Sequence, residues 1–127
     1  MTMTLEQIWN ELQPYEGEGS KKFSLPGIRV QFYKGAMEIP MIAFSPSSPL
    51  NLEKASLEEY ARLLSSYGFV LDCVTEGANY KINRGSDGQY LGRITPGALK
   101  LHAIRAKDLG WEPFNKMVSF HLGSVLS

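Results

Sequence analysis

Apolar residues near the N-terminus recur at the spacing of an amphipathic helix. Over residues 5–12 they fall at i, i+3, i+4 and i+7, which gathers them on one stripe. Thr4 and Gln7 form a capping-box pattern at the start, and Pro14 marks the expected end. A turn or loop is predicted at residues 16–20, where glycine and polar residues alternate.

Two strands are predicted next, because the period of the pattern changes from that of a helix to two. Residues 28–33 alternate apolar and polar side chains, which is typical of a half-buried strand. A turn at residues 34–36 leads to a second strand over residues 37–44. Pro40 interrupts that strand, and since proline cannot donate a ladder hydrogen bond, it favours an edge strand or a bulge.

A helix and three strands are predicted after the Ser/Pro-rich loop at residues 45–49. The helix covers about residues 56–67, with Ser56 and Glu59 as its capping box. Gly68 is placed to end it in a left-handed conformation. The strands are expected at residues 69–73, 80–84 and 89–95, and the turn signal at residues 85–88 joins the last two.

The last segments predict a helix and a short strand. Thr95 as N-cap and Pro96 at the first helical position begin a helix that runs to about Leu109. Gly110 ends this helix, and residues 118–122 alternate as a strand. The whole pattern predicts an α+β fold in the order α-ββ-α-βββ-α-β, with a mainly antiparallel sheet and helices packed on it.

The length of 127 residues suits a single domain over residues 1–127. Its first part, residues 1–50, holds the helix and the hairpin, and residues 51–127 hold the other elements. Lys and Arg number 13 and Asp and Glu number 13, which excludes a strongly basic or acidic protein. Residues 1–76 nevertheless hold six basic and ten acidic residues, whereas residues 77–127 hold seven basic and three acidic, so the chain either carries an electropositive face or pairs these charges across the fold.

Cys73 is the single cysteine, so no intrachain disulfide can form. No apolar run approaches the ~20 residues that span a bilayer, and no secretory leader pattern begins the chain. We therefore expect a cytoplasmic protein that does not bind membranes. Cys73 itself is either a nucleophile or, as its alternation with Phe69 and Leu71 favours, a small apolar residue facing inward.

Residues 57–110 contain a helix into Gly68, a strand to residues 77–80, a hairpin turn at Asp87-Gly88, and a strand into residues 95–97 before a closing helix. This order resembles the HicA toxin family, small ribonucleases with an α-β-β-β-α arrangement like that of double-stranded-RNA-binding domains. The family carries its catalytic histidine in a Gly-Ser-His motif on the second strand. Asn79 stands at the matching position and cannot take a proton near neutral pH, so the resemblance implies the fold without this general base.

Few residues suggest catalysis. His102 and His121 lack further Cys or His neighbours in sequence, so no metal site and no cofactor are expected. His102 and Asn79 are the candidate positions for a displaced catalytic group, and a solvent-facing position on its helix is the alternative for His102.

Two surfaces are candidates for binding a partner. The first is a basic group beside Tyr80 and Tyr90, which is typical of a phosphate-contacting surface, although a solvated face explains it as well. Its members are Lys81, Arg84, Arg93, Lys100, Arg105 and Lys107, with Lys100 and Lys107 on one helix face. The second is a protein-binding strip on the expected edge strand, formed by Met37, Ile39, Met41 and Phe44.

The absence of an assembled catalytic set favours a small non-catalytic interaction protein, an inhibitor or adaptor that docks on a protein partner. The alternatives are a nucleic-acid-binding module and a HicA-like ribonuclease toxin that uses His102. A homodimer through the edge strand is a further alternative.

Overall fold

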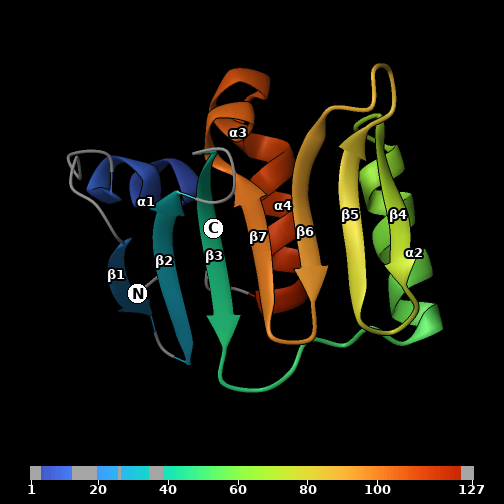
Figure 1. Ribbon diagram of the computed structural model, residues 1–127, viewed down its shortest axis with the longest axis horizontal. Coiled ribbons are helices and arrows are strands. Elements are labelled where there is room, and N and C mark those ends of the chain that lie inside the picture. Colours follow the sequence, from blue (N-terminus) through green and yellow to red (C-terminus); the bar gives the residue numbers. More distant parts are fainter. Residues whose placement is uncertain (1–3, 13–19, 26, 35–38, 124–127) are drawn as a thin grey trace.

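The structure is a computed structural model that describes residues 4–12, 20–25, 27–34 and 39–123 (Figure 1). Its helices are α1 (Leu5–Leu12), α2 (Lys54–Ser65), α3 (Ala103–Leu109) and α4 (Trp111–Leu122). Its strands are β1 (Ser20–Leu25), β2 (Ile28–Lys34), β3 (Pro40–Pro46), β4 (Phe69–Thr75), β5 (Asn79–Arg84), β6 (Tyr90–Thr95) and β7 (Ala98–His102).

All seven strands form one antiparallel sheet in the order β1-β2-β3-β7-β6-β5-β4. The predicted α+β class, with an antiparallel sheet and helices packed on it, is confirmed. Strand β3, from the first part of the chain, pairs with β7, from the second part. The sheet therefore runs without interruption through both parts.

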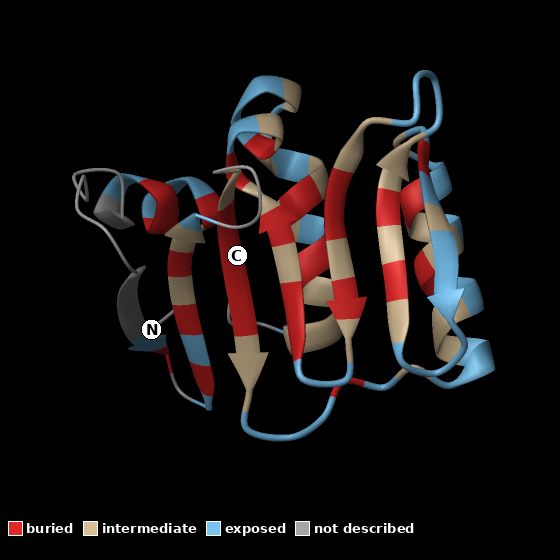
Figure 2. Cartoon of the chain, viewed as in Figure 1, coloured by how far each residue is buried: buried red, intermediate tan, exposed pale blue. Residues whose placement is uncertain are grey.

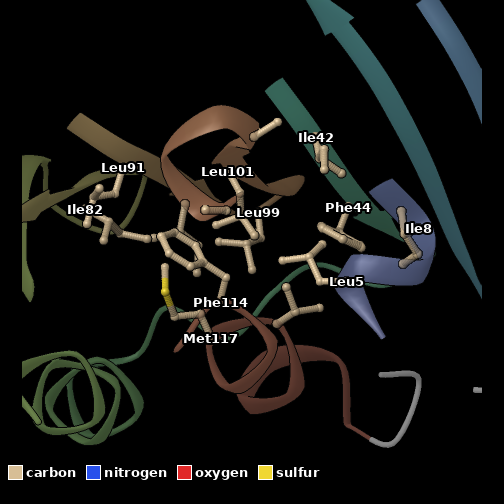
Figure 3. Close-up of a cluster of buried hydrophobic side chains, with 14 of the residues drawn as sticks. Leu5, Ile8, Ile42, Phe44, Ile82, Leu91, Leu99, Leu101, Phe114 and Met117 are labelled. Carbon is tan, nitrogen blue, oxygen red and sulfur yellow. The ribbon is translucent and has the colours of Figure 1, made fainter. Parts of the chain in front are cut away.

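The helices cover one face of this sheet. In Figure 1, α2 and α4 lie behind the strands, and the other face of the sheet is turned to the viewer. Figure 3 shows the core between the layers, where Phe44 and Leu99 of the sheet meet Leu5 of α1 and Phe114 of α4. These four side chains are fully buried. The bands of buried and partly exposed residues along β2 in Figure 2 follow the alternation that the sequence predicts for this strand.

The start of α1 is confirmed as a capping box. The Thr4 N–H donates to Gln7 Oε1 at 2.8 Å, and the Gln7 N–H donates to Thr4 Oγ1 at 3.1 Å. The next free amide, that of Leu5, donates to Asn115 Oδ1 of α4 at 2.7 Å. Because helix N-termini leave amides without intrahelical acceptors, this bond both satisfies a donor and fastens α1 to α4.

The predicted edge strand at residues 37–44 is wrong in its position within the sheet. Strand β3 pairs with β2 on one side and β7 on the other, so it lies in the interior of the sheet. Pro40 is its first residue, where a missing backbone donor is tolerated. Residues 37 and 38 and most of the predicted loop at residues 16–20 lie outside the described residues, while β1 is a strand that the sequence pattern did not predict.

The first half of the predicted helix at residues 95–109 is also wrong. Pro96 and Gly97 form a two-residue turn between β6 and β7, across which Thr95 pairs with Ala98. The helix begins only at Ala103, with Gly110 at its end as predicted. Proline after a Thr suits a turn as well as a helix start, and Leu99 and Leu101 alternate inward once β7 has neighbours on both sides.

Two smaller predictions at helices are corrected as well. Residues 118–122 belong to α4, whose buried residues Phe114, Met117 and Val118 follow the helical spacing instead of a period of two. Helix α2 begins at Lys54, so Ser56 lies inside it and is not its N-cap. Gly68, shortly after this helix, has a φ of 78°, which agrees with the predicted left-handed conformation.

Candidate nucleic-acid interface

The face of the sheet opposite the helices carries the outward-pointing half of each strand. From β2 to β5, cross-strand partners form one continuous line across five strands. Its members, in order, are Gln31, Ala43, Lys100, Arg93 and Lys81. No helix of the described residues covers this line (Figure 1).

Three cations stand side by side in this line. Arg93 lies directly opposite Lys100 on β7 and directly opposite Lys81 on β5. Directly opposed residues on one sheet face have Cβ atoms about 4.5–5.5 Å apart, and like charges at that distance destabilise a sheet. We call Lys81, Arg93 and Lys100 the basic row.

Among the described residues no ion pair reaches the basic row, although Asp72 on β4 lies directly opposite Lys81 at its end. The Asp72 carboxylate accepts a hydrogen bond from Asn83 Nδ2 at 2.5 Å. The ion pair found in the described part of the chain joins Arg84 to Asp87 instead.

The Nε of Arg93 is buried and has no hydrogen-bond partner among the described residues. An unsatisfied buried donor costs about 1–3 kcal/mol, so this nitrogen lowers the stability of the folded protein.

Two half-buried tyrosines, Tyr33 on β2 and Tyr90 on β6, lie next to the basic row. Burial raises the pKa of both hydroxyls, and the neighbouring Tyr90 raises the pKa of Tyr33 further. The Arg93 guanidinium opposes this effect at both rings, so the three side chains are electrostatic neighbours. Both hydroxyls therefore stay protonated at neutral pH and present neutral aromatic rings.

A β-bulge places Tyr90 on this face. Ile82 pairs with Gly92 and Asn83 pairs with Tyr90, so Leu91 is the extra residue of β6. Leu91 enters the core with Ile82 (Figure 3), and Tyr90 lines the larger hollow of the open face. Bulges often re-aim side chains beside functional sites. Gly92 allows this arrangement, because a Cβ there would meet the Lys100 carbonyl oxygen at 2.3 Å.

The open face is hollowed over these residues. The larger hollow, of about 630 Å³, includes the basic row, both tyrosines and Asn83 among its lining residues. A second hollow, of about 400 Å³, adjoins it and shares Tyr33 and Lys100. No Asp or Glu of the described residues lines either one.

The structure thus brings together half of the predicted basic group. Arg84 forms the turn ion pair with Asp87, and it helps to lower the pKa of that carboxyl to about 2. Arg105 and Lys107 lie on α3, whereas Lys100 lies on strand β7. The prediction that Lys100 and Lys107 share a helix face is therefore wrong.

The prediction for one of the two stacking rings is wrong. Tyr80 is buried, with its hydroxyl accepting from the Gly77 N–H at 2.7 Å. Tyr33, which is not one of the predicted rings, lies beside the basic row in its place. Its alternation with Phe32 was the signal that it faces away from the core.

The predicted protein-binding strip is not an exposed surface. Phe44 is fully buried in the core, and Met41 is 5% exposed. Ile39 is half-buried and lines the larger hollow. Met37 lies outside the described residues.

His102 has a structural role as the N-cap of α3. Its Nδ1 accepts from the Arg105 N–H at 3.3 Å. Burial, followed by the Arg105 charge, lowers its pKa. Asn79, the other candidate for a displaced catalytic group, begins β5, and its Oδ1 is buried without a partner among the described residues.

Cys73 faces the helix side of the sheet as expected, but it is exposed, so the expectation that it is buried is wrong. It lines a hollow of about 530 Å³ between α2 and the β4–β5 hairpin, on the helix side of the sheet. The described residues hold no group of three or more potential metal ligands. Within the same residues, no helix has both the length and the apolar character needed to cross a membrane.

Comparisons with models of protein families, with curated proteins and with solved structures find no match. The resemblance to the HicA family stays a prediction. Residues 57–110 contain four strands between α2 and α3, one more than the α-β-β-β-α arrangement that the resemblance implies.

Proposed function

We propose that this protein is a non-catalytic nucleic-acid-binding module that contacts phosphates with the open face of its sheet. The observation that carries the proposal is the basic row, in which Lys81, Arg93 and Lys100 stand in cross-strand register and form no ion pair among the described residues. Such a line is unfavourable for the folded protein alone, and a bound polyanion would relieve it.

The length of the basic row suits a chain of phosphates better than a single small anion. Two strand spacings of about 4.8 Å separate Lys81 from Lys100, so the row extends over roughly 10 Å. Successive phosphates of one nucleic-acid strand lie ~3.4 Å apart along a duplex axis, and further apart in an extended strand. The row therefore has room for two or three phosphates.

The zero net charge of the chain does not oppose this function, because attraction depends on the local potential. Three phosphate contacts correspond to a slope near −2 for log K against log salt with a single strand. We expect modest affinity that falls steeply with salt.

Fluorescence anisotropy tests the proposal directly. Labelled 12-nucleotide RNA and DNA of mixed sequence are titrated with the wild-type protein, with Arg93→Gln and with Lys116→Gln. Lys116 is exposed on α4, on the helix side of the sheet, and its substitution removes the same charge.

We expect binding of the wild type and Lys116→Gln at low salt, and binding at least fivefold weaker for Arg93→Gln. Equal weakening by both substitutions would contradict a site on the sheet face, and so would the absence of any binding by the wild type.

The geometry supports this function better than the two alternatives from the sequence. Docking on a protein partner through residues 37–44 relied on an exposed edge strand, whereas β3 is interior. Ribonuclease chemistry at His102 relied on a free imidazole, whereas its Nδ1 caps α3.

A further inference from the structure

We infer that the ligand of the open face is a single strand whose phosphates lie along the basic row and whose unpaired bases stack on Tyr33 and Tyr90. This inference rests on the proposed function and narrows its ligand class. It follows from a second line of residues beside the row and from the width of the face.

The second line runs beside the basic row, two residues away along β2, β3 and β5 and three residues away along β6, where Leu91 forms the bulge. Tyr33 pairs with Met41 at one end of it, and Tyr90 pairs with Asn83 at the other. Two residues along a strand cover about 6.6 Å. A strand of nucleic acid that crosses the sheet can therefore place its phosphates on one line and its bases on the other.

The second line has the chemistry that bases require. Tyr33 and Tyr90 are neutral aromatic rings, and the apolar Met41, which is 5% exposed, lines the same hollow. Aromatic rings bind unpaired bases of any sequence through their faces. Asn83 adds a carboxamide at the end of the line, within the same hollow.

A duplex does not fit this arrangement. From β2 to β5 the face spans four strand spacings, roughly 19 Å, whereas the major groove of B-DNA is ~12 Å wide. A face of this width stays outside the groove and touches only the phosphates of a duplex. The half-buried tyrosines then have no unpaired base to stack on, so a duplex contacts the basic row alone.

Three ten-nucleotide DNA probes of equal backbone charge per strand separate the possibilities by fluorescence anisotropy. The first is a single strand, the second is the same strand annealed to its complement, and the third is a single strand whose central nucleotides are abasic. We expect the first probe to bind at least tenfold more tightly than the other two, since each stacked base contributes about tenfold or more.

Variants of the tyrosines add a readout that depends on the ring itself. Tyr90→Leu is expected to weaken the intact single strand about tenfold and to leave the abasic strand unchanged, whereas Tyr90→Phe retains binding. Tyr33→Leu and Tyr33→Phe form a second pair, which keeps the test decisive if one leucine variant does not fold.

The outcomes separate the inference from the proposed function. Equal affinity of the wild type for all three probes, together with loss of binding in Arg93→Gln, would overturn base stacking and leave phosphate binding intact. No binding of any probe at low salt would overturn both.

Discussion

The two faces of this sheet are built from the same strands but obey different physical requirements. Along β7, Leu99 and Leu101 are fully buried toward the helices, while Lys100 between them points to the open face. Because strand side chains alternate, one strand can serve the core and a binding surface at once. The helix-covered face supplies the stability, and the open face is free to carry groups that reduce it.

The open face carries two costs that the other face avoids. Arg93 lies between two lysines in register, and its Nε has no partner among the described residues. On the helix side, the core around Phe44 and Phe114 is a continuous cluster of buried apolar side chains. Local costs of this kind accumulate where a protein binds or catalyses, since function limits how far stability is optimised.

The largest expected effect comes from the helix-covered face. Phe44→Ala should lower the free energy of unfolding by about 3–5 kcal/mol, because it removes a fully buried ring and leaves a cavity. Lys100→Gln, on the neighbouring strand but on the open face, should change it by less than about 0.5 kcal/mol. Urea denaturation of both variants checks the contrast, and similar losses would contradict the division of roles between the faces.

The second effect is a pH dependence of stability that originates on the helix side. His121 on α4 packs edge-on against the buried Tyr60 ring at a centroid distance of 4.2 Å, and burial lowers its pKa from 6.5 to about 4. The unfolded chain binds a proton below pH 6.5 while the folded protein resists it, so stability is full above pH 6.5 and falls as the pH drops to about 4. The loss amounts to roughly 3 kcal/mol at most.

His121→Phe should remove most of this slope, as measured by denaturation at several pH values between 7 and 4. His102, whose pKa is also lowered, accounts for the remainder. A slope unchanged in His121→Phe would show that the histidine takes up its proton at the same pH in the folded and the unfolded protein.

The smallest effect has the opposite sign and belongs to the open face. Arg93→Gln removes two like-charge contacts, so the free energy of unfolding should stay the same or rise by up to about 1 kcal/mol. Arg84→Gln serves as the comparison, because it breaks the ion pair with Asp87 and should not stabilise the protein. Thermal denaturation at low salt resolves the two, and a marked destabilisation by Arg93→Gln would mean that Arg93 supports the fold.

Much of the fold could be predicted from local pattern, and the exceptions have a physical cause. The alternation in residues 28–33 and the capping box at the start of α1 are local signals, and both are confirmed. Residues 98–102 are rich in Ala, Leu and Lys, which favour helices in isolation. Their strand conformation is stabilised by β3 and β6 on either side, and no local pattern contains that information.

The candidate site shows the same limit. Lys81, Arg93 and Lys100 could be recognised as basic residues, but their alignment depends on β7 being a strand. The direction of Tyr90 depends on the bulge at Leu91, which reverses the alternation that its neighbours imply. Register and bulges are set by tertiary pairing, so the sequence predicted the members of the site better than its geometry.

The most direct test of a binding face is the salt dependence of single-strand binding. The affinity of the wild type for a ten-nucleotide single strand is measured between 50 and 200 mM salt, beside Arg93→Gln and the matched charge control Lys116→Gln. We expect a slope of log K against log salt near −2 for the wild type and the control, and a slope shallower by about 0.7 for Arg93→Gln. The same slope in all three proteins would contradict phosphate binding by the basic row.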